Sequence, residues 1–304
     1  MAVDLSLERI AGAVDEIDPA FLGSPQYVDE GLSLALGREV VVKVETLNPI
    51  GSFKGRGTWL LARGLDPALT WVCATAGNFG QGIAYAARAH GAPAMVFVGP
   101  DVPAYKVQRL RALGADVRVT EGAEEAAHAF AGDAGDRILV KDGKDPAIAE
   151  GAGTIAVELE RAGPFDAVVV QVGDGALITG VARWLKDRSP RTRVIGVCAE
   201  GAPAMAESFA AGRPVSTPGT NTIATALAIT DPVPESLERL RALVDEIVLV
   251  DDDDLRAAMD LVARTVGILV EPAGAAGVAA LARHANWVPG DRVAVLLTGA
   301  GSPD

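Results

Sequence analysis

One lysine stands inside a short glycine-rich segment that follows an apolar run. The segment covers residues 48–57 (NPIGSFKGRG), and the run before it covers residues 40–44. We predict a strand for the run and a tight turn for the segment, because Pro49 cannot easily continue a strand and the glycines let the backbone bend before a helix at Thr58. An amine at the mouth of such a turn can form a Schiff base with a carbonyl ligand once burial lowers its pKa. Lys54 is therefore a candidate covalent catalyst, although a lysine in a turn is more often an ordinary surface residue.

Three other turns rich in glycine and small polar residues also follow apolar runs, at residues 75–80, 173–176 and 298–301. Ligands of open parallel sheets bind at the carboxyl ends of the strands, so these turns could form one crevice. Residues 173–176 open a predicted helix, and their N–H groups and the helix dipole could hold a phosphate. Neither this turn nor the pair Gly80 and Gly82 completes a G-x-G-x-x-G motif, which disfavours a nicotinamide dinucleotide. Each turn taken alone is also compatible with ordinary strand-to-helix geometry.

Short apolar runs alternate along the chain with helix-like stretches of about 10 to 15 residues. This alternation predicts βαβ units and therefore an α/β fold with open, mostly parallel sheets. The four aspartates at residues 251–254 precede a predicted helix, and we interpret them as an N-cap and first turn rather than a metal site. The predicted strands are residues 40–44, 71–74, 94–98, 117–120, 167–172, 194–199, 247–250 and 293–297, and the predicted helices are residues 31–36, 58–63, 81–90, 104–113, 150–161, 177–186, 202–211, 255–266 and 274–283.

Composition narrows the class of function. The 304 residues carry a net charge of -13, which argues against nucleic-acid or anionic-membrane partners because both need a basic patch. Cys73 and Cys198 lie in apolar runs and are interpreted as buried thiols. Two cysteines and three scattered histidines do not form a cluster of metal ligands at the usual spacings, so no metal site is predicted. The N-terminus lacks the apolar core of a signal peptide, and no apolar run reaches the roughly 18 residues of a membrane helix. We therefore expect a soluble, cytoplasmic protein that acts on small molecules.

Five sequence blocks, taken together, are more specific than any single turn. In their order and content they resemble the pyridoxal-phosphate enzymes of fold type II, the tryptophan synthase β-like family, and within it the threonine and serine dehydratases. The resemblance extends over nearly the whole chain, and the Ser-Phe-Lys block is its most diagnostic part. The blocks are residues 51–57 (GSFKGRG), 76–82 (AGNFGQG), 173–177 (GDGAL), 271–275 (EPAGA) and 297–299 (LTG).

The resemblance implies a role for residues in and beside these blocks. Lys54 would hold pyridoxal 5'-phosphate as a Schiff base and later remove the Cα proton of the substrate, with Phe53 packed near the cofactor. Asn78 would hydrogen-bond the phenolic oxygen of the cofactor, and Thr298 would face its pyridine nitrogen. The phosphate would be bound by the backbone of Gly173, Asp174, Gly175, Ala176 and Leu177, Glu271 would also belong to the cofactor site, and the substrate carboxylate would be bound by Thr75, Ala76, Gly77 and Asn78.

Several positions depart from the pattern of the family. Asp174 replaces a glycine of the phosphate loop, so its carboxylate must point away from the phosphate or be offset by a cation. Ala76 stands where the resembling serine racemases carry a catalytic serine, which disfavours racemisation. Glu200 matches a metal-binding glutamate of those racemases, yet no second carboxylate follows it, so no metal is predicted. Residues 223–226 and 298–301 look more like threonine synthases, and the chain length leaves no room for a C-terminal regulatory domain.

We expect a pyridoxal-phosphate ammonia-lyase that deaminates threonine or serine to a 2-oxo acid and ammonia by α,β-elimination. The hydroxyl of Thr298 cannot keep the pyridine nitrogen protonated as a carboxylate would, and the resulting weaker electron sink favours elimination of a β-substituent. The alternatives are a β- or γ-replacement enzyme like threonine or cysteine synthases, for which Arg56 and Lys106 are the only candidate phosphate-binding residues, and a cofactor-binding protein without activity.

The expected architecture has two α/β domains with the cofactor between them. Residues 1–70 and 147–304 would form the larger, cofactor-binding domain, and residues 71–146 the smaller, substrate-binding domain. The family also suggests a homodimer.

Overall fold

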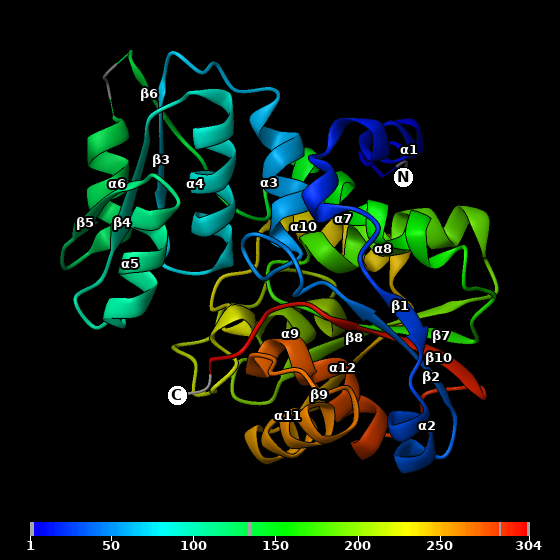
Figure 1. Ribbon diagram of the computed structural model, residues 1–304. Helices are drawn as coiled ribbons and strands as arrows, with labels where there is room; N and C mark the ends of the chain where they lie inside the picture. Colours follow the sequence, from blue (N-terminus) through cyan, green and yellow to red (C-terminus); the bar gives the residue numbers. More distant parts are fainter. Residues whose placement is uncertain (1–2, 133–134, 286, 303–304) are drawn as a thin grey trace.

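The chain has an α/β fold built on two separate sheets (Figure 1). The computed structural model describes residues 3–132, 135–285 and 287–302. The larger sheet has the strand order β1-β2-β10-β7-β8-β9, and all neighbouring strands are parallel except the antiparallel pair β1 and β2. Its strands are β1 (Gln26–Val28), β2 (Glu39–Val44), β7 (Ala167–Gln171), β8 (Arg193–Ala199), β9 (Glu246–Val250) and β10 (Arg292–Leu297).

The smaller sheet contains only parallel pairs, in the order β5-β4-β3-β6. Its strands are β3 (Thr70–Ala74), β4 (Ala94–Val98), β5 (Asp116–Val119) and β6 (Arg137–Leu139), and the helices packed on it are α4 (Asn78–His90), α5 (Ala104–Ala112) and α6 (Ala123–Ala131). The predicted α/β fold with two open, mostly parallel sheets is therefore confirmed. The domain boundaries at residues 71 and 146 stay a prediction.

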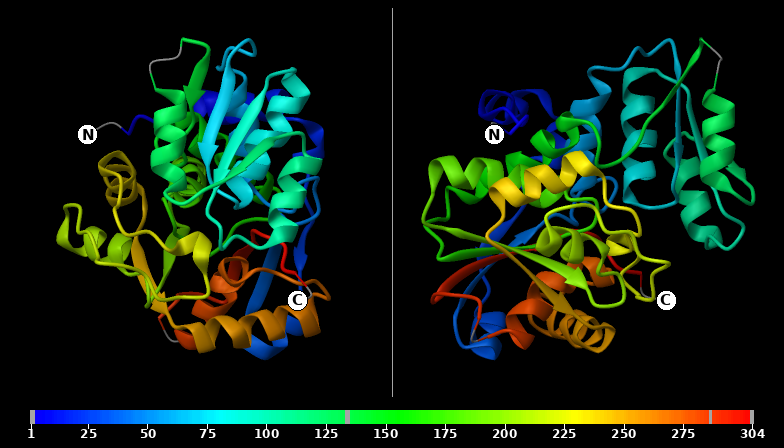
Figure 2. Two further views of the ribbon diagram at one scale, coloured as in Figure 1. Left: turned by 90° about the vertical axis from the view of Figure 1, so that its left-hand side faces the viewer. Right: turned by 180° about the vertical axis from the view of Figure 1, so that it is seen from behind.

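Helices cover both faces of the larger sheet (Figures 1 and 2). Successive side chains of β2 point to opposite faces, so Val41 joins one buried cluster while Val40 and Val42 join the other. Helices α2 (Glu30–Leu36), α11 (Asp252–Thr265) and α12 (Pro272–Arg283) pack on the second of these faces, and the opposite layer contains α1 (Leu7–Glu16), α3 (Lys54–Ala62), α7 (Pro146–Leu159), α8 (Ala176–Arg188), α9 (Ala204–Ala211) and α10 (Pro234–Leu243).

Helix α3 connects the two parts of the molecule because it packs against both α7 and α4. It begins at Lys54, and not at Thr58 as the sequence predicted. Two of the glycines interpreted as turn residues, Gly55 and Gly57, lie in this helix and serve close packing instead, whereas Gly51 lies in the turn with a φ of 65°. A Cβ at Gly55 would lie 2.1 Å from the ring of Phe21, and one at Gly57 would lie 2.5 Å from the carbonyl oxygen of Ile148.

Other local predictions had mixed outcomes. The interpretation of residues 251–254 is confirmed, because Asp251 is the N-cap of α11 and forms a capping box with Asp254. Helices α6 and α10 and the short strands β1 and β6 were not predicted. Cys73 and Cys198 are buried free thiols as predicted, and burial raises the pKa of each to about 12. Within the described ranges, no helix has both the length and the apolar character needed to cross a bilayer.

The contact between α7 and α8 depends on Gly180. A Cβ at this position would lie 1.9 Å from the carbonyl oxygen of Ala149. We expect Gly180→Ala to lower the free energy of unfolding by about 1–3 kcal/mol, because the two helix backbones must separate. Gly12→Ala is the matched control in α1, where the nearest atom to a new Cβ is 3.9 Å away. The control should raise the free energy of unfolding by about 0.5–1 kcal/mol through helix propensity. Urea denaturation measures both, and equal effects of the two variants would contradict this account.

Candidate active site

A cavity of about 1490 Å³ is lined by residues from both sheets. The three glycine-rich turns predicted to share a crevice all reach it, since they follow β3, β7 and β10 at the carboxyl ends of these strands. The predicted site residues that line it are Phe53, Lys54, Thr75, Ala76, Gly77, Asn78, Gly173, Asp174, Gly175, Leu177, Glu271 and Thr298. The side chain of Ala176 is buried behind the cavity wall.

Lys54 lies in the first turn of α3 with its amine between two carboxylates. Its Nζ is 2.6 Å from Asp142 Oδ2 and 2.9 Å from Asp174 Oδ2, and the side chain is 14% exposed. Burial lowers the pKa of Lys54, as we expected, but the two carboxylates outweigh burial and raise that pKa above its ordinary value. The prediction of a lowered pKa is therefore wrong for the protein alone, because the sequence did not reveal this pair of acids.

The two carboxyl groups behave differently from one another. Burial and the charge of Asp174 raise the pKa of Asp142 to about 7, although Lys54 opposes the rise. Burial also raises the pKa of Asp174, but Lys54 and the N–H of Ala176 outweigh it and leave that pKa below its ordinary value. Both carboxyl groups contact the same amine, Lys54 Nζ. Sequence reasoning missed Asp142, which follows the strand β6 that was also missed.

The turn before Lys54 is fixed by hydrogen bonds to its own residues and to the end of β10. The side chain of Asn48 accepts from the N–H of Ser52 and donates to the carbonyl oxygen of Glu45. The N–H of Phe53 donates to the carbonyl oxygen of Thr298 over 3.1 Å. These bonds therefore fix the position of Lys54 relative to Thr298.

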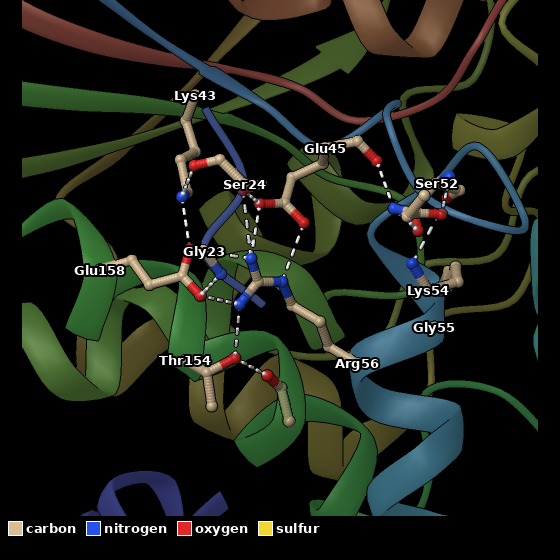
Figure 3. A network of polar contacts seen from close by, with 12 residues as sticks. Gly23, Ser24, Lys43, Glu45, Ser52, Lys54, Gly55, Arg56, Thr154 and Glu158 are labelled. Carbon is tan, nitrogen blue, oxygen red and sulfur yellow. Dashed lines mark hydrogen bonds and ion pairs between the residues drawn. The ribbon is translucent and has the colours of Figure 1, made fainter. Parts of the chain in front are cut away.

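A buried ionic network anchors the other side of the same helical turn (Figure 3). The guanidinium of Arg56 is fully buried, 2.8 Å from Glu45 of the segment after β2 and 2.7 Å from Glu158 of α7. Burial raises the pKa of Glu158, but Arg56 and Lys43 outweigh burial and lower it to about 2. Arg56 therefore does not reach the cavity and cannot bind a phosphorylated substrate there. The network is completed by Ser24 and Thr154.

The cavity lining also carries a smaller set of polar contacts. Gln171 Nε2 donates to the hydroxyl of Thr298 over 2.5 Å and to the backbone oxygens of Ala273 and Leu296. Asn78 Nδ2 donates to Glu271 Oε1 over 3.0 Å. Burial raises the pKa of Glu271, although Lys106 and Asn78 oppose the rise. Asn78, Glu271 and Thr298 thus come together from three distant parts of the sequence.

Comparison with known proteins identifies the family of the chain. The family model described as "Pyridoxal-phosphate dependent enzyme" matches residues 22–299. The chain belongs to this family. The resemblance found in the five sequence blocks and the expected dependence on pyridoxal phosphate are therefore confirmed.

Individual relatives in this family match most of the chain. An L-threonine ammonia-lyase of Thermotoga maritima is 34% identical over 276 residues, which cover 88% of this chain and 68% of that protein. A phenylserine dehydratase of Ralstonia pickettii is 38% identical over 304 residues, or 97% of this chain and 93% of that protein. The crystal structure of a T.th. threonine deaminase superposes with a TM-score of 0.92 at 33% identity and covers 98% of this chain and 99% of that chain.

The residues present fit pyridoxal phosphate. Helix α8 points its N-terminus toward the cavity, and its N-cap Gly175 has a φ of 95° and contributes no side-chain cap. N–H groups at such a helix start lack intrahelical partners and suit an anion. A Cβ at Gly173 would lie 2.5 Å from the carbonyl oxygen of Ala226, so the loop is closely packed. One of the N–H groups at this helix start already has a partner, because the N–H of Ala176 donates to Asp174 Oδ1 over 2.7 Å.

The ionic network around Arg56 predicts a large loss on removing Glu158. We expect Glu158→Ala to lower the free energy of unfolding by about 3–5 kcal/mol, because it leaves Arg56 and Lys43 with too little negative charge. Glu39→Ala removes a carboxylate that is 47% exposed and pairs with Arg292. This control should lower the free energy of unfolding by less than about 1 kcal/mol. Urea denaturation of both variants tests the prediction, and similar losses for the two would contradict it.

The position of Asp174 predicts an effect on cofactor affinity. Asp174→Gly frees the N–H of Ala176, removes a negative charge beside the phosphate and removes one carboxylate that keeps Lys54 protonated. We expect the dissociation constant for pyridoxal phosphate to fall about 3- to 10-fold. Titration of the cofactor-free protein, followed by absorbance, measures it. Asp187→Asn, near the other end of α8, is a control that should leave the affinity unchanged, and weaker binding by Asp174→Gly would overturn the prediction.

Proposed function

We propose that this chain is a pyridoxal-phosphate ammonia-lyase that deaminates threonine or serine to a 2-oxo acid and ammonia by α,β-elimination. The observation that carries the proposal is the convergence of Lys54, the helix start at Gly175 and the hydroxyl of Thr298 on one cavity. The relatives named L-threonine ammonia-lyase and phenylserine dehydratase support the reaction type.

In this proposal the site residues hold the cofactor as follows. Lys54 would bind it covalently, Phe53 would pack near it, and Asn78 would hydrogen-bond its phenolic oxygen. Thr298 faces the pyridine nitrogen, and Gln171 fixes the hydroxyl of Thr298 from behind. Glu271 stays bonded to Asn78 and orients that amide. The backbone of residues 173–177 would bind the phosphate, for which the carboxylate of Asp174 would have to release the N–H of Ala176.

The start of α4 is suited to the substrate carboxylate. Gly77 is the N-cap of this helix and provides no side-chain cap, so N–H groups at the helix start are available to an anion. The hydroxyl of Thr75 accepts from the N–H of Gly77 over 3.0 Å and shapes the turn. Residues 75–78 would hold the carboxylate and thereby orient the Cα–H bond of the substrate.

The cofactor, when bound, withdraws electrons from Cα and makes its proton acidic. Lys54 is the group of this chain placed to accept that proton at Nζ. Ala76 provides no acid or base for the opposite face, which favours elimination over racemisation. A replacement reaction on a phosphorylated substrate has less support, because Arg56 is committed to the buried network and only Lys106 of the two basic candidates lines the cavity.

The organisation of the protein completes the proposal. Residues 1–70 and 147–304 form the cofactor-binding domain, and residues 71–146 form the substrate-binding domain, with the cavity between them. The protein acts as a homodimer in the cytoplasm. Lining of one cavity by residues of both sheets supports the division into domains.

The first test is the absorbance spectrum of the protein with pyridoxal phosphate. We expect a band characteristic of a bound Schiff base that Lys54→Ala abolishes and Lys141→Ala, a control at the cavity rim, retains. Addition of L-threonine or L-serine should release 2-oxo acid, and Lys54→Ala should lower that rate by at least about 10²-fold, the scale of positioned proton transfer. Phosphate release from O-phosphohomoserine without oxo-acid formation would favour a replacement enzyme. Absence of this band in the unmodified protein would contradict the proposal.

A further inference from the structure

The carboxyl group of Asp142 has no part in the roles described above, although it touches the central lysine. It follows β6 in the smaller sheet, whereas Lys54 and Asp174 belong to elements around the larger sheet. Asp142 Oδ2 is 2.6 Å from Lys54 Nζ, and Asp142 Oδ1 accepts from the N–H of Gly143. The side chain lines the cavity and is 26% exposed. It is therefore open to a bound substrate.

Elimination from a β-hydroxy amino acid needs an acid as well as a base. Hydroxide is a poor leaving group, so the β-oxygen must gain a proton as its bond to Cβ breaks. Lys54 begins the reaction as the base and cannot at that moment be the acid. A second proton-carrying group close to Lys54 would let the leaving oxygen gain its proton while Lys54 takes the one from Cα.

Among the described carboxyl groups that line the cavity, the positions favour Asp142. Burial raises the pKa of Asp174, but Lys54 outweighs burial and keeps that pKa below its ordinary value, and Glu271 is engaged by Asn78. The remaining carboxyl groups of the described lining, on Asp101, Glu124 and Asp231, are exposed. Of these described groups, Asp142 and Asp174 both line the cavity and bond to Lys54, and Asp142 makes the shorter contact, 2.6 Å against 2.9 Å.

We propose that Asp142 donates the proton that converts the departing β-hydroxyl into water, and that Lys54 then returns a proton to Asp142. This inference rests on the proposed function. The proton balance closes within the site: Lys54 Nζ takes the proton from Cα, and Asp142 gives its carboxyl proton to the leaving oxygen as the Cβ–O bond breaks. The proton on Lys54 then crosses the 2.6 Å contact to Asp142. The net products of this step are one water and the dehydrated substrate.

The surroundings of Asp142 keep it able to carry a proton near neutral pH. The groups that face it are Lys54 from α3, Asp174 from the loop after β7 and the thiol of Cys73 from β3. Burial and Asp174 together raise its pKa to about 7, against the opposing effect of Lys54. A phosphate bound beside Asp174 adds negative charge, which raises the pKa of a nearby carboxyl group further.

The decisive experiment compares two leaving groups in the cofactor-loaded protein. L-Serine needs protonation of its leaving oxygen, whereas β-chloro-L-alanine loses chloride, which needs none. We expect Asp142→Asn to lower kcat for L-serine by about 10²- to 10⁴-fold and to change kcat for β-chloro-L-alanine less than about 3-fold. Asp142→Glu should recover part of the L-serine activity. Asp231→Asn, which removes an exposed carboxylate from the rim of the same cavity, should leave both activities unchanged.

The outcomes separate the two proposals. Turnover of β-chloro-L-alanine by Asp142→Asn, with an unchanged cofactor spectrum, shows that this variant folds and binds the cofactor. Equal loss of both activities, or no loss of either, would overturn the role of Asp142 and leave the lyase assignment standing. Failure of the unmodified protein to turn over either substrate would remove both proposals.

A second readout does not depend on activity. Infrared difference spectra of the full chain should show a carboxylic acid signal that disappears as the pH rises through about 7, the pKa of Asp142. The signal should be absent in Asp142→Asn and present in Asp231→Asn. Its persistence in Asp142→Asn would assign the proton to another residue and would overturn the proposal.

Discussion

The ion pairs that Arg56 makes with Glu45 and Glu158 are the constraint on which the site depends. They join the end of β2, the start of α3 and the C-terminal part of α7 in a region closed to solvent. Because the guanidinium is fixed from two sides, the first turn of α3 cannot rotate or slide. Residues two apart on a helix point in nearly opposite directions, about 200° apart. The network that buries Arg56 therefore turns Lys54 toward the cavity.

A second balance of charge operates within the cavity itself. Lys54 is a cation in a largely buried place, and Asp142 and Asp174 provide the negative charge that it requires. Asp174 also occupies one N–H group of the helix start that would bind phosphate. The carboxylate engages a donor that the phosphate of the cofactor would use, so binding of the phosphate would exchange one anion for another at this helix start. This exchange explains how a carboxylate is tolerated in a phosphate-binding loop.

The sequence predicted the parts of the site that depend on local pattern. The valine-rich strands, the glycine turns at their ends and Lys54 were all evident from short segments. The direction of Arg56 was not evident, because it depends on whether the helix starts at Lys54 or at Thr58. Asp142 was missed because β6 is a three-residue strand of half-buried residues without a distinct apolar run. Its partner Lys54 is also 88 positions away in the sequence, so only the fold brings the two together.

The charges of the site also link cofactor binding to the acid that we propose. The Lys54 cation offsets one of the two negative charges that Asp142 and Asp174 carry when both are ionised. When Lys54 binds a carbonyl ligand it no longer offers a free ammonium group, and the phosphate adds further negative charge. Negative charge in a buried place favours uptake of a proton by the group whose pKa is nearest to neutral. Asp142, with a pKa of about 7, is such a group. Binding of the cofactor would therefore itself place a proton on the residue that must deliver one.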